Sequence, residues 1–399
     1  MSDADEINAW PAGVLADLCS LSSASVLPAK SGVPIYVGLE HVDSGAFSLT
    51  RWASPQAFKS NAFVFQRGDV LYGKLRPNLD KAVIAPDAGV CSTELLVLRP
   101  KPDVPSGFLL AILHTPEFIA YALSSADKQY PRTSWSWISQ YPIPRPSSDE
   151  QKKIAVVLGK VQEAATLQDD IARVARELKQ AALRMLFTRG IRGEPKKQTD
   201  IGPVPESWDI VPFSKFVTLQ RGADLIKSEF RRGTVPVIGA TRIIGYHDTA
   251  NVHGPGVTVV RSGSSAGKAM FIPTDFWAHN VVLYVRDFLG NDPSFTAHWI
   301  NLIDLTRFRA GVAVPTLNRN SFENEPVPLP DPAEQREIAG LLATLDAKIA
   351  HHEARQTLLR ELFRTLLHDL LTARRRVMSP DLSDQPIGAI KIGSSTMPA

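Results

Sequence analysis

Residues 142–189 recur with substitutions as residues 326–373, and this internal repeat constrains the fold more than any other feature of the chain. The two segments align without a gap at a constant offset of 184 in residue number, with 14 identical positions. About three identities are expected from average residue usage. Both copies begin with alternating prolines and then Glu-Gln, as PIPRPSSDEQ and PVPLPDPAEQ. The chain therefore consists of two related halves that end in the same kind of element.

Each copy of the repeat is predicted to form one long helix. The prolines hold the approach extended and cannot continue into a helix. Asp149 or Ser148 in the first copy, and Asp331 in the second, can accept hydrogen bonds from the free N–H groups of the first turn. No proline follows until after residues 189 and 375. Forty residues make about 60 Å of helix, and a helix of that length needs a packing partner.

Large and small apolar side chains recur along both helices at a mean spacing close to the 3.5 residues of a left-handed coiled coil. Small alanines in the first helix match larger residues in the second, so we expect the two helices to pack antiparallel within one chain. Packing of each helix on a different protein is the alternative. The predicted seam contains Ile154, Leu158, Val161, Leu178, Leu186, Ile338, Leu342, Leu345, Leu362 and Leu370.

A globular segment precedes each helix. Both segments contain short β-type runs separated by Gly, Pro and Asn, and each has one helix-like stretch, at 107–123 and 294–308. The predicted fold class is α+β: two pseudo-repeated α/β domains, each followed by a long helix, with the helices packed as an antiparallel coiled coil. The predicted boundaries are 1–145 for the first domain, 146–190 for the central helix, 191–331 for a linker and the second domain, 332–376 for the distal helix and 377–399 for a disordered tail.

The composition is that of a globular protein of two or three domains, with 399 residues, 44% of them apolar and 21% charged. No run of about 18 apolar residues occurs, and the acidic N-terminus lacks the apolar core of a secretory signal. Cys19 and Cys91 indicate no disulfide framework. We therefore expect a cytoplasmic protein that does not bind membranes. A net charge of +3 permits nucleic-acid binding without requiring it.

Catalytic and metal-binding motifs are absent from the sequence. The stretch SGSSAGKA resembles a phosphate-binding loop, but Ser262 stands where its first glycine would be and Ala269 where its hydroxyl would be. No zinc-like cysteine spacing, HExxH or GxGxxG occurs, and neither does the Asn/Asp-Pro-Pro-aromatic motif of amino-methyltransferases. His351 and His352 are adjacent, so they project about 100° apart on a helix and cannot form a metal pair. The chain is predicted to be non-catalytic and to bind no metal.

The chain resembles the specificity subunits of type I restriction–modification systems over residues 10 to 375. The resemblance rests on the junction LFTRGIRGEPKKQTDIGPVPESWDIV (186–211), the repeated proline–Glu-Gln helix starts, and the motifs GDVLYGKLRPNLDK (68–81) and RSGSSAGK (261–268). It implies two target-recognition domains that each read one half of a split, asymmetric DNA site. It also implies two helices that fix the separation of the half-sites and dock methyltransferase subunits.

The same resemblance implies the partners and the cofactors. Its partners would be double-stranded DNA, two methyltransferase (modification) subunits and two restriction subunits. S-adenosylmethionine would bind the modification subunit, and ATP and Mg the restriction subunit, so this chain would bind none of them. The assembled complex would be an adenine-specific DNA methyltransferase and an ATP-dependent endonuclease. The alternatives are a stand-alone methyltransferase without a restriction subunit and, from another class, a coiled-coil scaffold whose domains bind proteins or glycans.

Polar and basic residues cluster at corresponding places in the two domains. In the first domain they surround a turn shaped by Pro77, and in the second they lie in a Gly/Ser loop whose N–H groups and hydroxyls suit phosphate. A second candidate surface precedes each proline track, where Arg and Asn suit base edges; it also contains Thr133 and Thr316, and we interpret Trp135 and Trp137 there as structural. The basic run of Arg221, Lys227, Arg231 and Arg232 is interpreted as contacting phosphate or simply exposed. Exposed turn charges without a ligand are the alternative for any one residue. The predicted DNA-binding residues are Lys74, Arg76, Asn78, Lys81, Arg132, Ser134, Arg221, Arg261, Ser262, Ser264, Ser265, Lys268, Asn318, Arg319 and Asn320.

Overall fold

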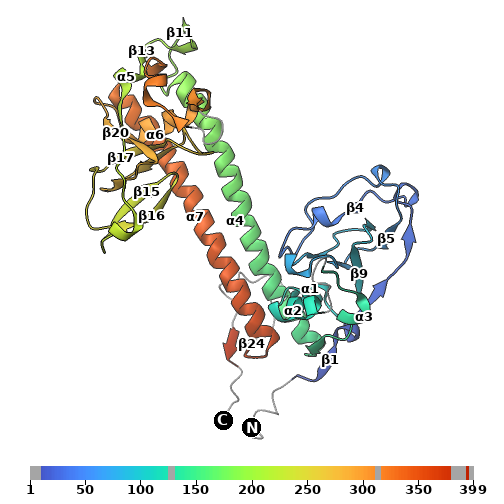
Figure 1. Ribbon diagram of the computed structural model, residues 1–399. Coiled ribbons are helices and arrows are strands. Elements are labelled where there is room, and N and C mark those ends of the chain that lie inside the picture. The colour runs from blue at the N-terminus through green and yellow to red at the C-terminus, as the bar shows by residue number, and fades with distance from the viewer. Residues whose placement is uncertain (1–9, 125–130, 311–315, 379–391, 395–399) are drawn as a thin grey trace. The chain divides into compact units, whose positions relative to one another are not determined.

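The computed structural model describes residues 10–124, 131–310, 316–378 and 392–394 (Figure 1). The chain divides into two compact units, residues 1–169 with 353–399, and residues 170–352. The two long helices are α4 (Ser148–Arg189) and α7 (Pro332–Leu371). Each unit contains one globular domain and a part of each long helix. The predicted fold class is confirmed: two α/β domains, each followed by a long helix.

The first domain contains two four-stranded sheets. Helices α1 (Ser106–Leu113) and α2 (Pro116–Ser124) share a hydrophobic core with one of them. That sheet has the antiparallel order β2 (Cys19–Ser22), β9 (Leu95–Pro100), β6 (Val70–Gly73), β7 (Ala82–Ile84). The other has the order β3 (Ser25–Val26), β5 (Ala62–Phe65), β8 (Gly89–Cys91), β4 (Tyr36–Val37), with its last pair parallel. Shorter elements are β1 (Ala12–Val14), β10 (Pro142–Pro144), α3 (Trp135–Ile138) and the 3-10 turns Leu15–Asp17, Pro28–Lys30, Leu39–His41, Pro55–Ala57 and Pro77–Leu79.

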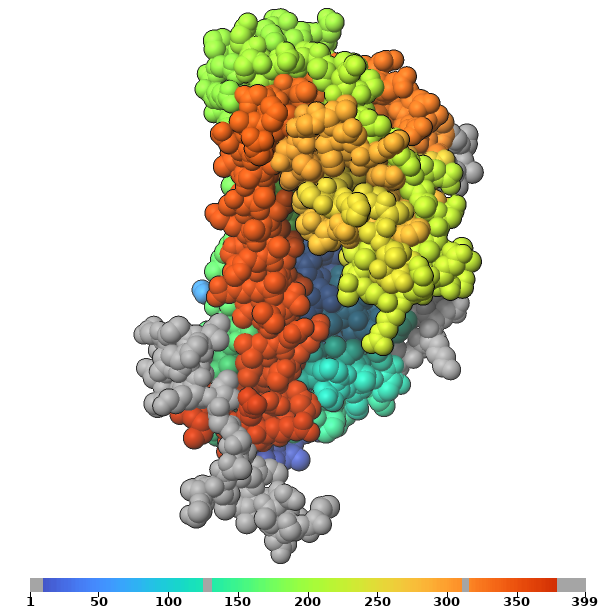
Figure 2. Space-filling model, turned by 90° about the vertical axis from the view of Figure 1, so that its left-hand side faces the viewer, coloured from blue at the N-terminus to red at the C-terminus, as the bar shows by residue number. Residues whose placement is uncertain are grey.

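The second domain has the same plan. Its four-stranded sheet has the order β14 (Thr218–Arg221), β20 (Val282–Asp287), β17 (Gly256–Val260), β18 (Ala269–Ile272), and its second sheet the order β16 (Arg242–His247), β15 (Val235–Gly239), β19 (Trp277–Ala278). Helix α6 (Pro293–Leu302) shares a core with the N-terminal part of α7, which it lies against in Figure 2. Shorter elements are β11 (Lys196–Thr199), β12 (Gly202–Pro205), β13 (Asp209–Pro212), α5 (Phe213–Phe216), β21 (Arg309–Ala310), β22 (Thr316–Leu317), β23 (Pro326–Leu329) and the 3-10 turns Lys227–Glu229, Leu305–Phe308 and Arg319–Phe322.

The repeat extends to the register of the strands. Tyr72 pairs with Leu96 in the first domain, and Val259 pairs with Leu283 in the second, so both partners are offset by 187 in number. Each proline track is a strand in a two-stranded sheet, β10 with β1 and β23 with β13. Proline is tolerated there because such a strand has a free edge and needs no N–H on that side.

Both long helices begin with an equivalent capping hydrogen bond. The Oγ of Ser147 accepts a hydrogen bond from the N–H of Glu150, and Oδ1 of Asp331 accepts one from the N–H of Glu334. The two caps therefore occupy equivalent positions of the repeat, and the first is Ser147 rather than Asp149 or Ser148. Those two side chains have other partners, because Ser148 donates to the carbonyl of Asp103 and Asp149 pairs with Lys153.

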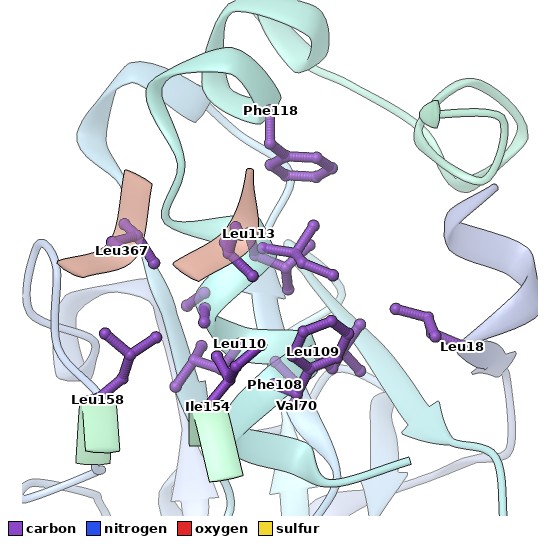
Figure 3. Packing of buried hydrophobic residues seen from close by; sticks show 14 of the residues in the cluster. Leu18, Val70, Phe108, Leu109, Leu110, Leu113, Phe118, Ile154, Leu158 and Leu367 are labelled. Atoms are coloured by element: carbon purple, nitrogen blue, oxygen red, sulfur yellow. The ribbon is translucent and has the colours of Figure 1, made fainter. Parts of the chain in front are cut away.

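The helix packing is antiparallel in each unit. In the first unit, Ile154 and Leu158 of α4 share a core with Leu367 of α7, and Figure 3 shows all three directed toward the α1 side chains. In the second unit, Leu186 near the end of α4 shares a core with Ile338 near the start of α7. The start of each helix therefore packs beside the end of the other.

Two predicted seam residues are wrong. Leu178 is 55% exposed and Leu362 is 40% exposed, whereas their neighbours Lys179 and Phe363 face inward. The Lys179 ammonium pairs with Asp346 at 2.5 Å, and the Phe363 ring packs edge-to-face on Phe47. Alternating steps of three and four residues lead to 179 and 363, so the spacing decides the seam rather than the leucine side chains. Of the other predicted seam residues, Leu345 is half-buried, and the rest are buried: Ile154, Leu158, Val161, Leu186, Ile338, Leu342 and Leu370.

The predicted disordered tail differs from the structure at its described residues. Val377 is buried in the core of the first unit, and β24 (Arg375–Val377) pairs with β25 (Ile392–Ser394). The remainder of the predicted tail, 379–391 and 395–399, lies outside the described residues.

The described helices include no single one that is both long and apolar enough to cross a membrane. Taken together, α1 and α2 meet the criterion of length and composition, although they are bent by 64° at their junction. Every residue of α1 from Phe108 to Leu113 is buried in the protein core.

Candidate nucleic-acid interface

The turn after β6 in the first domain has an unusual backbone. Arg76 and Asp80 have φ of 51° and 49°, in the left-handed region, on either side of the 3-10 turn Pro77–Leu79. Asp80 holds this turn to the domain: its Oδ1 lies 2.6 Å from Nδ1 of buried His114, and its carbonyl accepts the N–H of Gly45. Burial, with Asp80 nearby, raises the pKa of the Tyr72 hydroxyl, so this phenol stays neutral.

The two surfaces predicted in the first domain meet at this turn. The N–H of Thr133 donates to the carbonyl of Lys74 at 2.9 Å, and the N–H of Arg76 donates to that of Pro131 at 2.6 Å. Leu75 and Arg132 form an isolated β-bridge between these bonds. Residues 74–78 and 131–134, which are far apart in sequence, therefore form one surface.

The predicted side chains of this surface are held differently. Arg76 and Asn78 are exposed and Lys74 is half-buried. Arg132 is exposed but forms an ion pair with Glu94 at 2.9 Å. The Lys81 ammonium donates to the carbonyl of Leu39 at 2.7 Å, which gives it a structural contact inside the domain. Glu94 was missed by the sequence reasoning because nothing in the sequence connects it to Arg132.

Three further side chains lie beside them. Ser134 is exposed and shares a hydrogen bond with Ser136. Trp135 packs partly on the core of the unit. Trp137 is 40% exposed, stacks on Tyr121 and donates to the Tyr121 carbonyl. Both tryptophans thus have packing partners within the domain.

The second domain repeats this backbone arrangement. The N–H of Leu317 donates to the carbonyl of Arg261 at 2.8 Å, and Ser262 bridges to Thr316. The N–H of Arg261 donates to the carbonyl of Val281, and in the first domain the N–H of Lys74 donates to the carbonyl of Glu94. Lys74 and Arg261 are therefore equivalent residues, and each brings a cation to the same place in its domain.

The Gly/Ser loop of the second domain is closed by an arginine that the sequence reasoning missed. Gly263 and Gly267 have φ of 91° and 94°, which an L side chain rarely adopts. The Arg309 guanidinium donates to the carbonyls of Ser264 and Ala266 and so fixes the loop between these glycines. Arg309 is distant from the loop in sequence, and no motif marks it. Ser264 and Lys268 are exposed on this loop, while Ser262 and Ser265 are half-buried.

Further predicted residues of this domain belong to the same neighbourhood. Arg221 Nε donates to the carbonyl of Asn280 at 3.4 Å, next to the residue that binds Arg261. Arg319 Nη1 donates to the carbonyl of Leu219 at 2.9 Å. Asn318 caps the 3-10 turn that follows it by accepting the N–H of Asn320, whose own side chain is exposed. Lys227, Arg231 and Arg232 are all exposed.

The described residues include no group of three or more His, Cys, Asp or Glu placed to hold a metal ion. His351 and His352 stack on each other in an edge-to-face arrangement, as adjacent helix residues would.

Comparisons with known proteins identify relatives of the chain. The family model of the type I restriction modification DNA specificity domain matches residues 205–361. The type I restriction enzyme MjaVIII specificity subunit of Methanocaldococcus jannaschii is 32% identical over 89 residues, which are 22% of this chain and 21% of that protein. The proposed MjaX specificity subunit of the same organism is 20% identical, over 87% of this chain and 88% of its own length.

The fold has a solved counterpart. The crystal structure of a type I restriction–modification system S subunit from M. genitalium superposes with a TM-score of 0.67 at 14% sequence identity, covering 91% of this chain and 96% of that chain. At this identity the likeness establishes the fold, and the family model and the full-length relative add the sequence match. The chain is therefore similar, over residues 205–361 in its family model and over most of its length in fold, to the specificity subunits of type I restriction–modification systems.

Proposed function

We propose that this chain recognises a bipartite, asymmetric DNA site, with one half-site read by each domain. The observation that carries the proposal is the repeated frame around Lys74 and Arg261. Both residues have the same backbone partners in their domains and bring a cation to the same place, whereas the adjacent loops differ in sequence and shape. Phosphate contacts position a protein on DNA, and base contacts specify the sequence. A shared cationic position with divergent loops suits two domains that dock alike and read different bases.

Recognition in two parts makes the distance between the half-sites part of the specificity. The proposed spacer is the pair α4 and α7, with 42 and 40 residues. A 40-residue helix is about 60 Å long, against roughly 34–36 Å for one turn of duplex DNA. A stiff pair of helices would bind well only to half-sites at the matching separation.

The proposed partners on the helices are two modification subunits. Exposed apolar side chains recur at equivalent places, Val174 and Leu178 in α4 and Leu358 and Leu362 in α7. Members of each pair are four residues apart and therefore adjacent on one helix face. Two equivalent apolar patches on one chain suit two copies of the same partner.

The proposed assembly also contains two restriction subunits. We propose that S-adenosylmethionine binds the modification subunits and that ATP and Mg bind the restriction subunits. This chain would then supply recognition and docking without a catalytic centre of its own. In the assembly it would direct adenine methylation and ATP-dependent cleavage.

Binding of the assembled complex to spacer variants of its DNA tests the proposed function. A duplex with both half-sites at the native separation should bind tightly. Duplexes with two base pairs added to or removed from the gap should bind much more weakly, although every specific base is present. Equal binding to all three duplexes would contradict the bipartite proposal.

A variant on each helix tests the docking. Leu178→Asp places a charge in the α4 patch and Leu362→Asp places one in the α7 patch, and each should remove one of the two modification subunits. The number of subunits can be counted from the intact mass of the complex. Leu302→Asp is the matched control, because Leu302 is 42% exposed at the end of α6 and belongs to neither apolar patch. Retention of both subunits in both variants would contradict this docking surface.

A further inference from the structure

The outer strand of the second domain's three-stranded sheet exposes apolar side chains. This strand, β16, pairs with β15 on one side only. Ile243 is 47% exposed, Ile244 39% and Tyr246 54%. Edge strands normally carry charged or short side chains, because their unpaired backbone groups invite association. Three of the four consecutive residues 243–246 of this edge strand are thus apolar and exposed. Such a cluster indicates a surface that contacts another molecule.

The charge around this strand is positive. Residues 221–248 contain five Lys and Arg side chains against three carboxylates. Each carboxylate has a partner: Asp248 pairs with Arg231 at 3.1 Å, Glu229 accepts the N–H of Ile226, and Asp224 accepts from the Asn280 amide. Within the described part of the chain, no carboxylate lies within ion-pair distance of Lys227, Arg232 or Arg242. An anionic molecule complements this surface.

The hairpin adjoins the proposed DNA surface through three consecutive residues. The N–H of His279 donates to the carbonyl of Ile238 at the end of β15. The carbonyl of Asn280 accepts from Arg221, and that of Val281 accepts from the N–H of Arg261. The turn end of the β15–β16 hairpin, where Arg242 and Ile243 lie, is therefore continuous with the surface that carries Arg221 and Arg261.

Packing fixes the orientation of the hairpin. A side chain at Gly245 would meet the Phe230 ring at 2.3 Å, so Phe230 covers the Gly245 face of β16. Neighbouring residues of a strand point to opposite faces, so Tyr246 points away from Phe230. His247 is buried and packs edge-to-face on Trp277. The β15–β16 register shifts at Ile244, so that Ile243 pairs with Ile238 and Gly245 with Val237. Ile243 therefore lies on the same face of β16 as Tyr246, and Phe230 packs on the opposite face.

We propose that this hairpin enters the major groove of DNA and that Ile243 contacts the methyl group of a thymine. The proposal rests on the DNA-recognition function proposed above and assigns part of the reading to β16. The major groove is about 12 Å wide and admits a two-stranded ribbon. Thymine presents there the one apolar group of the four bases, its 5-methyl. Tyr246 lies farther along the same strand and extends the contact, and Arg242, Lys227 and Arg232 face phosphates.

Replacement of thymine by uracil tests the contact, because it removes only the 5-methyl group. In the complex of this chain with its modification subunits, each thymine of both half-sites is replaced in turn. We expect one position at which uracil weakens binding about fivefold, the effect of losing one buried methyl group. Ile243→Ala should weaken binding to the thymine duplex by a similar factor and should be insensitive to uracil at that position. Leu302→Ala, another exposed apolar residue of this unit, should retain full binding and full sensitivity.

Three results would overturn the inference. One is that the wild-type complex binds its site specifically but its affinity is unchanged when any thymine is replaced by uracil. This test uses the wild-type protein alone and so does not depend on the folding of a variant. Another is that Ile243→Ala keeps the uracil sensitivity of wild type. The third is that Ile243→Ala and Tyr246→Ala keep DNA affinity but lose a protein subunit, which would make the hairpin a protein contact. If the wild-type complex itself showed no specific DNA binding, that result would instead contradict the proposed function.

Discussion

The two halves of this chain agree where their long helices begin and differ where they would meet DNA. At the start of α4, Trp10 donates its indole N–H to Glu150 at 3.0 Å, and at the start of α7, Trp208 donates to Glu334 at 3.1 Å. Arg376 lies beside Glu150 and Arg192 beside Glu334, and these two arginines are also separated by the repeat offset of 184 residues. The loops that follow β6 and β17, residues 74–81 and 261–268, have the same length but share only their last residue, Lys81 and Lys268. The frame is thus repeated side chain by side chain, and the proposed reading loops are not.

The agreement has one informative exception. Gln335 uses its whole amide, since Nε2 donates to Pro330 and Asn291 and Oε1 accepts the N–H of Asp292. Gln151 repeats only the bond from Nε2, to Pro146, and its buried Oε1 has no hydrogen-bond partner among the residues that the structure describes. The residue equivalent to Asp292 in the strand-register alignment is Pro105, which has no N–H to donate. One proline therefore makes the two helix starts unequal.

The largest predicted effect concerns the corrected seam, at two adjacent residues of α7. Phe363→Ala should lower the free energy of unfolding by about 3 kcal/mol, because a buried ring that packs on Phe47 is lost. The adjacent change Leu362→Ala should cost less than about 1 kcal/mol, since that side chain is exposed. Denaturant unfolding of both variants measures the difference. A greater loss for Leu362→Ala would restore the seam predicted from sequence.

The second prediction compares the two Trp–Glu contacts. Glu334→Ala should cost about 2–3 kcal/mol of unfolding free energy, because Glu334 is fully buried and its loss leaves two N–H donors, of Ile191 and Trp208, without an acceptor. Glu150→Ala should cost about 1 kcal/mol, because its side chain is 19% exposed and water can replace it. Denaturant unfolding with tryptophan fluorescence follows both. Equal costs would mean that the two starts are energetically the same.

The third prediction exchanges the caps of the two helices. Hydrogen bonding from the N–H of Glu334, aided by Arg192, lowers the pKa of the Asp331 carboxyl. A lowered folded-state pKa gives stability that is present above the unfolded value of about 3.9 and is lost as the pH falls through the folded value. Asp331→Ser keeps a capping oxygen and removes only the charge, so it should cost roughly 0.3–1 kcal/mol at neutral pH and almost nothing in strong acid.

The reverse exchange is the matched control. Ser147→Asp should add an acid-sensitive contribution at the start of α4, where the native serine has none. Unfolding free energies measured from pH 6 down to pH 3 follow both variants. A pH profile that is unchanged by Asp331→Ser would show that this cap does not titrate as described.

The fourth and smallest prediction concerns the equivalent cations. Lys74→Ala and Arg261→Ala should each flatten the dependence of DNA affinity on salt by about one unit of slope, the value for one phosphate contact. Lys81→Ala is the control, because its ammonium already donates to Leu39 and should contribute nothing to the slope. Titrations of the complex from low to moderate salt give the slopes. Unchanged slopes for the first two variants would remove both residues from the interface.

The sequence predicted the repeated frame because the frame depends on local rules. Prolines, caps and the spacing of apolar residues lie close together in the chain, so both long helices and their antiparallel packing followed from them. Two seam positions were wrong because the leucines Leu178 and Leu362 were chosen over the residues that the three-and-four spacing selects. The first cap was wrong because Ser147 is followed by other polar residues that can cap a helix equally well.

The candidate site was predicted less completely because its contacts join distant parts of the chain. Arg309 closes the Gly/Ser loop, Glu94 pairs with Arg132, and Asn280 binds Arg221, each across tens of residues. The equivalence of Lys74 and Arg261 also depends on an offset of 187 rather than 184, which appears only in the strand register. Sequence reasoning placed the right residue types in each domain but could not tell which of them were already engaged.

Methylome sequencing of a cell that expresses this chain with its modification subunit tests the central claim most directly. Two domains with a shared frame and different loops should produce one split motif, with two unlike half-motifs at a constant gap and methylation on both strands. A single contiguous motif, or half-motifs methylated at variable separation, would contradict the claim that the two halves read one site together.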